Sequence, residues 1–461
     1  MKQEQNAGVS RELGTAPVGK LLLKLAAPTV VAQLVNLLYN IVDRIYIGHI
    51  PEVGRVALTG IGLCFPVIYL IGAFTYLIAQ GGAPRAAIAM GEGDDERAER
   101  IMGSCFTCLV VTAVLLTVLF WIFGERLLWI FGCSEETIVY ALPYMRIYSS
   151  GSVFVMMALG MNLFVTTQGF TQFSMRAVLI GAVSNIILDP IFIYALNMGV
   201  QGAALATVIS QAISGVWVVR FLMGKQTKLR LKRSALRPSL EIMGPVLALG
   251  LAPFIMQVTE ALLNISFNSS LQRYGGDIAV GAMTVASTVM QMVWIPAQGL
   301  GQGAQPIISY NYGAKNPQRV REAFWMLLKV SCVLMVSFWL LVELFPRFFI
   351  GIFNNEPALM DTAVWTLRLY TASLGLFGIQ MSAQQTFMAI GKAKASLFIA
   401  CLRKVILLIP LIFLLPRFFE NKVFAVFLAE PVSDFISVVV SAITLFLVFR
   451  PAMAALEGKE E

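Results

Sequence analysis

Two aspartates lie inside apolar segments and are the residues of this sequence best placed to do chemistry. Asp189 ends an apolar run that starts at Asn185, and Asp43 follows a similar run near the start of the chain. If these runs cross a membrane, inserting each charged carboxylate costs roughly 2.5 to 3.5 kcal/mol. A cation, a proton or a partner group must offset that cost, so both aspartates are candidates for ion binding.

Helical spacing gives these carboxylates oxygen-bearing neighbours. Asn185 lies one turn from Asp189 on the same face, and Thr207 lies at a similar depth if its segment forms a hairpin with theirs. Asp43 falls at that depth too, so two carboxylates, an amide and a hydroxyl form a hard oxygen set that suits Na⁺ or a shared proton. One alternative is that Asp43 pairs with Arg44. Another is that Asn185 holds Asp189 by a purely structural hydrogen bond.

A second group of acids lies in the later half of the chain. Glu430 and Asp434 are four residues apart, hence on one helical face, and Glu260 lies within another apolar segment. Such a cluster would attract a lipophilic organic cation. The alternative is that these acids pair with the basic residues Arg403 or Lys404. Weaker candidates for the lining of a binding cavity are Gln33, Asn36, Tyr39, Met256, Gln257 and Met290.

The elements that must position these residues are membrane-spanning helices. Of the 461 residues, 58% are hydrophobic and 13% charged, against roughly 25% charged in a soluble domain. The polar residues 1–19 lack the apolar core of a signal peptide, so the first apolar stretch is expected to remain as a span. The predicted spans are 21–47, 56–80, 101–123, 140–166, 173–196, 199–222, 241–268, 278–309, 323–346, 360–389, 395–416 and 422–449.

The distribution of basic residues predicts the orientation of these spans. Most of the 34 Lys and Arg residues lie in the tails and in alternate loops, among them Lys2, Arg11 and Lys459. By the positive-inside rule, both termini are expected in the cytoplasm, in a protein of the inner (plasma) membrane. The net charge of +8 is then a topology signal, so no nucleic-acid partner is expected. The densest cluster, residues 225–237, is expected to contact anionic membrane lipids.

The two halves of the chain repeat each other. Pro253 repeats Pro28 at an offset of 225 residues, and Gly313 repeats Gly91 at an offset of 222. Six spans in each half give both halves the same orientation, related by a pseudo-twofold along the membrane normal. The expected fold is therefore an all-α membrane protein with twelve transmembrane helices in two six-helix bundles. The expected domains are an N-terminal bundle over residues 1–223, a flexible cytoplasmic linker over 224–239 and a C-terminal bundle over 240–461.

Prolines inside the spans are candidate hinges, because proline kinks a membrane helix and frees backbone carbonyls. The candidates are Pro28, Pro190 and Pro253, although proline is also generally frequent in membrane helices. Two like-oriented bundles that rock about a central cleft are typical of transporters.

Enzyme chemistry finds little support in the sequence. The only histidine, His49, lies at the end of a span, and Cys105 and Cys108 lie in an apolar run without a second cysteine pair. Neither H-E-x-x-H nor G-x-S-x-G occurs. We therefore expect no enzymatic activity and no cofactor.

Together these residues resemble the multidrug and toxic compound extrusion (MATE) transporters, in particular the bacterial members. The resemblance covers nearly the whole chain and rests on residues 28–48, 185–190 and 202–207, with the two-bundle repeat. It implies a cation site in the N-terminal bundle, with the backbone carbonyl of Ala203 as a further ligand. The implied site residues are Asp43, Asn185, Asp189, Ala203 and Thr207.

The resemblance is incomplete in the C-terminal half. Glu260 matches a membrane acid found in part of the family. Some relatives carry a further acid in the tenth span, where this sequence has Gln380, Gln384 and Gln385. This departure weighs against a second cation site in the C-terminal bundle.

The resemblance implies secondary active export of small organic, often cationic, compounds. Na⁺ or H⁺ entering from outside would drive this multidrug efflux by alternating access. One chain holds both bundles, so a monomer is expected. The nearest alternative is a flippase for a lipid-linked precursor, but the spans hold few basic residues for a pyrophosphate. A ligand-sensing receptor is a more distant alternative.

Overall fold

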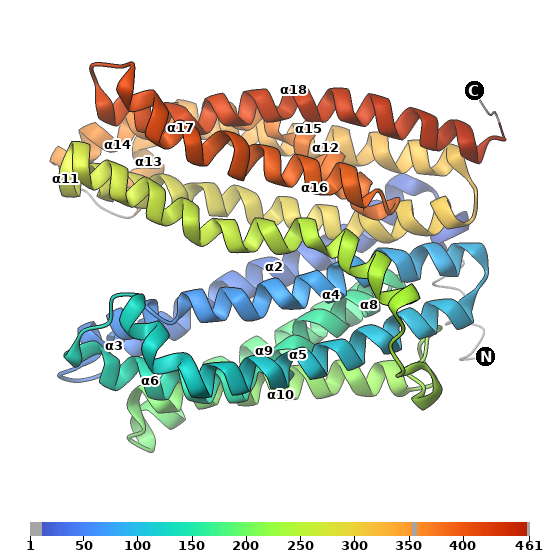
Figure 1. The fold of residues 1–461 in the computed structure, drawn as a ribbon, viewed down its shortest axis with the longest axis horizontal. Helices are drawn as coiled ribbons and strands as arrows, with labels where there is room; N and C mark the ends of the chain where they lie inside the picture. The colour runs from blue at the N-terminus through green and yellow to red at the C-terminus, as the bar shows by residue number, and fades with distance from the viewer. Residues whose placement is uncertain (1–11, 353–356, 459–461) are drawn as a thin grey trace.

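The computed structural model describes residues 12–352 and 357–458. Its helices form two groups that lie side by side, the first half of the chain in blue to green and the second in yellow to red (Figure 1). Both ends of the chain lie at the same end of the molecule, which we call the terminal end. The predictions for Lys2, Arg11 and Lys459 fall on residues outside the described ranges.

The first half consists of six helical passes, several of them built from more than one helix. In chain order the elements are α2 (Val18–Gly48), α3 (Gly54–Gly62), α4 (Phe65–Glu92), α5 (Asp95–Ile130), α6 (Glu135–Ser150), α7 (Ser152–Met156), the π-helix η1 (Met157–Met161), α8 (Asn162–Thr167), α9 (Thr171–Pro190), the π-helix η2 (Ile191–Ala195) and α10 (Gly199–Met223).

The second half follows a short linker helix, η3 (Arg233–Ala235). Its elements are α11 (Leu240–Gly313), α12 (Pro317–Leu344), α13 (Pro346–Gly351), α14 (Pro357–Tyr370), η4 (Leu374–Leu376), α15 (Phe377–Ala389), α16 (Ala393–Cys401), the π-helix η5 (Leu402–Leu408), α17 (Ile409–Leu414), η6 (Leu415–Arg417) and α18 (Lys422–Leu456).

Each of the twelve predicted spans has a helical counterpart, which confirms the predicted fold class. Nine helices of the described residues are long and apolar enough to cross a membrane, or ten if the pair α6 and α7–α8, bent by 57°, is one span. The 74-residue α11 contains two spans, because its backbone turns at Gly276 with φ 61° and ψ −158°. The tenth span is divided between α14 and α15. The chain is therefore a multi-pass membrane protein.

Near the terminal end the backbones of the two bundles approach each other closely at two places, each time at a glycine. A Cβ atom at Gly81 would lie 2.1 Å from the carbonyl oxygen of Val246, and one at Gly303 would lie 2.4 Å from the Cα of Ala26. Gly303 follows Gly81 by 222 residues, the offset of the sequence repeat. The two contacts are thus pseudosymmetric, and both need glycine for the close approach of backbones.

The first helix belongs to both bundles. Its initial residues, among them Val18, Leu21 and Leu25, are buried in one apolar cluster with Ile307 and Phe324 of the second half. Beyond this part, α2 packs against α9 of the first half. Pro28 lies within α2 between these two environments. The N-terminal bundle is thus tied to its partner through the helix that carries Asp43.

The linker between the bundles is anchored, contrary to the expectation that it is flexible. The Oε1 atom of Gln168 accepts hydrogen bonds from Thr227 Oγ1 at 2.6 Å and from the Leu229 amide at 2.8 Å. Glu99 accepts from the Arg230 amide at 3.0 Å and pairs with Lys232 at 2.5 Å. These contacts hold residues 227–232 against the N-terminal bundle.

Candidate functional site

Asp43 and Asp189 come together where α2, α9 and α10 pack against each other. Their carboxyl groups are close enough to interact with each other. Asp189 is fully buried, and Asn185 is 1% exposed. The structure therefore brings together two acids that are 146 positions apart in the sequence.

An amide and a hydroxyl extend this pair into a cluster of oxygens. Asn185 Nδ2 donates to Asp189 Oδ1 at 3.2 Å and to Thr207 Oγ1 at 3.4 Å. Thr207 Oγ1 in turn donates to the Ala203 carbonyl at 3.0 Å. All five residues of the implied cation site thus lie in one place, which we call the oxygen cluster.

A glycine allows the hairpin of α9 and α10 to close around the oxygen cluster. A Cβ atom at Gly202 would lie 2.7 Å from the backbone carbonyl of Phe192. The π-helix η2, directly after Pro190, carries Phe192 and Tyr194. Tyr194 Oη donates to the Tyr46 carbonyl at 2.6 Å and so ties this turn to α2.

Three oxygens of the cluster are buried without a hydrogen-bond partner: Asp43 Oδ1, Asp189 Oδ2 and Asn185 Oδ1. An unpaired buried acceptor costs about 1 to 3 kcal/mol, and more if it is charged. Arg44 was the alternative partner considered for Asp43. Its guanidinium lies over the ring of Phe65, 4.7 Å from the ring centre. The cluster therefore offers acceptors that a bound cation or proton would satisfy.

The types of ligand restrict which cation fits. Within the described ranges, no group of three or more His, Cys, Asp or Glu residues is arranged to hold a metal. The oxygen cluster supplies two carboxyls, an amide oxygen and a hydroxyl, and such hard ligands suit Na⁺ better than a transition metal. Two close carboxyls also suit a shared proton.

The acids of the C-terminal bundle lie in a different environment, because each is paired with a base. Arg403 Nε donates to Asp434 Oδ1 at 2.6 Å, and Arg403 Nη2 donates to Glu430 Oε1 at 2.8 Å. Lys404 pairs with Glu260 and also donates to the Met256 carbonyl at 3.1 Å. The alternative of ion pairing is the one observed, and we call these five charged groups the ion-pair cluster.

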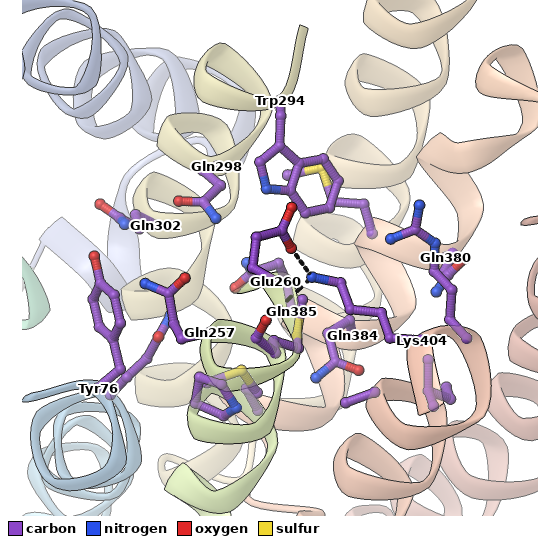
Figure 2. A pocket seen from close by; sticks show the side chains of 18 of the residues that line it. Tyr76, Gln257, Glu260, Trp294, Gln298, Gln302, Gln380, Gln384, Gln385 and Lys404 are labelled. Atoms are coloured by element: carbon purple, nitrogen blue, oxygen red, sulfur yellow. Dashed lines mark hydrogen bonds and ion pairs between the residues drawn. The ribbon is translucent and has the colours of Figure 1, made fainter. Parts of the chain in front are cut away.

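Two adjoining cavities lie beside the ion-pair cluster, with volumes of about 310 Å³ and 130 Å³. Figure 2 shows Lys404 meeting Glu260 within the larger cavity, with Gln298 and Gln302 on one side and Gln380 on the other. Among the predicted substrate-binding residues, Met256, Gln257 and Glu260 line the larger cavity, and Glu260, Met290 and Glu430 line the smaller one. The hinge candidate Pro253 also lines the larger cavity. Asp434 is on the lining of neither.

The predicted lining residues on α2 are not on the lining of either cavity. Gln33 Nε2 donates to Gln302 Oε1 at 3.1 Å and so links the bundles. The Asn36 carbonyl accepts from Asn40 Nδ2 at 2.6 Å. Tyr39 Oη accepts from Gln211 Nε2 at 3.5 Å.

Eight glutamines line the larger cavity, and of these the sequence had predicted only Gln257 as a lining residue. They come from α4, both parts of α11 and α15. A signal was available on α11, since Gln291, Gln298 and Gln302 are spaced by seven and four residues and so share a helical face. Trp294, on the same part of α11, also lines the cavity.

Comparisons with known proteins agree with this architecture. The family model described as MatE matches residues 28–191 and 253–414. The multidrug export protein MepA of Staphylococcus haemolyticus is 24% identical over 420 residues, which cover 91% of this chain and 92% of that protein. MepA of Staphylococcus aureus is 24% identical over 409 residues, or 88% of each chain.

Solved structures show the same fold. A crystal structure described as MATE in the bent conformation superposes with a TM-score of 0.89 at 23% identity, covering 98% of each chain. A MOP superfamily transporter from Pyrococcus furiosus superposes with a TM-score of 0.88 at 23% identity, covering 97% of this chain and 98% of that one. The family match covers both repeats of the sequence, and the chain therefore belongs to the MatE family of transporters.

Proposed function

We propose that this protein is a secondary active exporter of small organic compounds, driven by Na⁺ or H⁺ bound between Asp43 and Asp189. Membership of the MatE family supports transport, and the relatives described as multidrug export proteins support the direction and the breadth of substrates. The observation that carries the choice of coupling site is the set of unpartnered buried oxygens in the oxygen cluster.

Cation binding would act on the first helix. Two charged carboxylates at close range repel each other, and a bound Na⁺ or a shared proton removes that repulsion and draws α2 toward α9. Because the first residues of α2 are packed in the C-terminal bundle, a displacement near Asp43 reaches that bundle through Pro28. Pro28 is therefore the hinge that we favour, and Pro190 and Pro253 remain further candidates.

Coupling requires that the cation and the substrate prefer different states of the two-bundle equilibrium, because a ligand indifferent to both states shifts neither. In the structure the bundles are in contact near the terminal end. With both termini proposed to be cytoplasmic in the plasma membrane, this is a state closed to the cytoplasm. A cation from outside would then reach the oxygen cluster and promote release of the substrate outward.

The proposed topology also supports proposals for the remaining partners. We propose that the basic linker around residues 225–237 contacts anionic lipid headgroups, and that a single chain transports as a monomer. A flippase that binds a lipid pyrophosphate would need free basic groups in the cavity. Arg403 and Lys404 line the cavity but are engaged by carboxylates, so this alternative has less support.

Transport by the purified protein in liposomes tests the proposal. Efflux of a fluorescent organic compound is measured under an imposed Na⁺ gradient and, separately, under a pH gradient. We expect one of the two gradients to drive efflux, and Asp43→Asn and Asp189→Asn to abolish it while the folded protein stays in the membrane. Asp277→Asn, an exposed acid on α11, is the matched control and should retain transport. Gradient-driven efflux by both Asp43→Asn and Asp189→Asn would disprove the coupling site.

A further inference from the structure

We propose that the larger cavity, which α4 of the N-terminal bundle lines together with helices of the C-terminal bundle, binds uncharged aromatic compounds that carry N–H or O–H donors, in preference to organic cations. This inference rests on the proposed export function and specifies the class of compound that its cavity accepts. Three observations carry it: the amide lining of the cavity, the internal neutralisation of its charged groups and its aromatic walls.

The first observation is the unsatisfied amide oxygens on α15. The Oε1 atoms of Gln380, Gln384 and Gln385 are buried and have no hydrogen-bond partner. All three residues line the larger cavity. Gln384 is fixed from behind, because its Nε2 donates to Ser396 Oγ at 2.8 Å. These amide oxygens on one helix thus lack donors, and an occupant whose N–H or O–H groups reach them from the cavity would supply the missing donors.

The second observation is that the carboxylates near this cavity already have cationic partners. Arg403 holds Glu430 and Asp434, and Lys404 holds Glu260. An organic cation that displaced Arg403 or Lys404 from these acids would leave a buried charge without a partner, which is strongly unfavourable. An anion would face the same difficulty with the acids. An uncharged occupant breaks none of these pairs.

The charge balance of the ion-pair cluster fits an uncharged occupant as well. The cluster holds three carboxyls and two bases, and Glu430 Oε2 is buried without a partner. A proton on that oxygen makes the cluster neutral overall. Glu430 lines the smaller cavity and is not on the lining of the larger one.

The third observation is the aromatic wall. Four aromatic side chains line the same cavity: Tyr69 and Tyr76 of α4, Trp294 of α11, and Phe377, the first residue of α15. The guanidinium of Arg403 lies over the ring of Phe377, 4.7 Å from its centre, so this ring is already engaged by a cation of the protein. Flat rings gain by stacking on such walls. The preferred compound is therefore a flat ring system with hydrogen-bond donors at its edge.

Three probes with the same three-ring frame separate charge from donor capacity. Acridone is uncharged and has one N–H donor, xanthone is uncharged and lacks that donor, and 10-methylacridinium carries a permanent positive charge. Binding of each to the purified full-length protein is measured by fluorescence or calorimetry without any ion gradient. We expect acridone to bind most tightly, and Gln380→Leu or Gln385→Leu, whichever removes the acceptor of its single N–H, to weaken acridone binding about tenfold while hardly changing that of xanthone.

Gln305→Leu is the matched control. Gln305 is also a buried glutamine, 6% exposed on α11, and it lies on neither cavity lining. The thermal midpoint of each variant shows that it is folded, and two separate cavity variants guard against the failure of one. The inference is overturned if 10-methylacridinium binds as tightly as acridone, if the folded protein binds none of the probes, or if both cavity variants keep wild-type affinity for acridone.

These outcomes are distinct from failure of the proposed function. A protein that binds acridone with the expected dependence on Gln380 or Gln385 but transports under neither gradient would refute coupled export and leave the cavity assignment intact. A protein that transports under a gradient but prefers 10-methylacridinium would refute the cavity assignment alone.

Discussion

The two bundles carry their buried acids in opposite ways. In the N-terminal bundle, Asp43 and Asp189 meet each other and leave buried oxygens without partners. In the C-terminal bundle, Glu260, Glu430 and Asp434 are each paired with Arg403 or Lys404. A repeat that shares its helix order and its glycine contacts has thus acquired two different electrostatic sites.

This difference separates exchange from structure. A carboxylate pair without a fixed base has to take a cation from outside the protein, so its occupancy can follow a gradient. Acids that are held by a tethered guanidinium or ammonium already have a cationic partner within the protein, although one oxygen of Glu430 still lacks a partner. The N-terminal bundle is therefore suited to coupling, and the C-terminal bundle to holding a compound without a change of charge.

The largest effect is expected from giving the N-terminal bundle a tethered cation of its own. Thr207→Lys places an ammonium near the unpartnered oxygens of Asp43 and Asp189, where it would replace the exchangeable cation. We predict complete loss of the response to either gradient in liposome efflux and a raised thermal midpoint. Thr207→Met, of similar length and without charge, is the control for bulk. Gradient-driven efflux by Thr207→Lys would contradict the distinction between the bundles.

The converse change removes the base of the C-terminal bundle. Arg403→Leu leaves Glu430 and Asp434 buried without their partner, and we predict a loss of about 3 to 5 kcal/mol of stability. The thermal midpoint of the purified protein measures this loss. Combining Arg403→Leu with Glu430→Gln and Asp434→Asn should restore most of it, because no unpaired charge then remains. A melting curve of Arg403→Leu that matches wild type would show that these pairs do not stabilise the bundle.

The next effect concerns closure of the bundles near the terminal end. Gly81→Val places side-chain atoms against the Val246 carbonyl, where even a Cβ would be 2.1 Å away. We predict that the bundles no longer close there and that transport is lost. A cysteine introduced at Ala83, which is 2% exposed in the closed state, should become reactive to a thiol reagent in that background. Gly72→Val, on the same helix with nothing within 4 Å, should leave Ala83→Cys protected.

The smallest effect is expected from trimming the oxygen cluster. Thr207→Ala removes one hydroxyl ligand and the hydrogen bond to Ala203, and both carboxyls remain. We predict that the gradient needed for half-maximal efflux rises severalfold, equivalent to about 0.5 to 1.5 kcal/mol, and that Thr207→Ser restores it. If Thr207→Ala lost transport as completely as Asp189→Asn, the hydroxyl would be essential to the site and not one ligand among several.

The sequence predicted the helical spans and the oxygen residues for identifiable physical reasons. Apolar length and the positions of loops decide the spans, and helical period decides that Asn185 and Asp189 share a face. The contact between Asp43 and Asp189 depends on how α2 packs on α9, but a common depth in the membrane was enough to suggest it. The same depth argument did not reveal that α2 begins in the core of the other bundle.

Two features depended on packing that no local pattern encodes. Which of Glu260, Glu430 and Asp434 would pair with a base depends on the π-helix η5, which directs the adjacent residues Arg403 and Lys404 to different acids. The linker looked flexible because its composition is polar and basic. Its anchors, Gln168 and Glu99, lie 61 and 131 positions before the linker residues whose amides they hold.

The most direct test of the account is a count of the cation at the oxygen cluster. Equilibrium binding of radioactive Na⁺ and proton uptake from a weakly buffered solution are measured on the purified protein, without substrate and across a pH series. We predict that the wild-type protein binds an exchangeable Na⁺ or H⁺ that both Asp43→Asn and Asp189→Asn lose, whereas Glu430→Gln keeps it. Cation binding that survives in Asp43→Asn and Asp189→Asn and disappears in Glu430→Gln would contradict it.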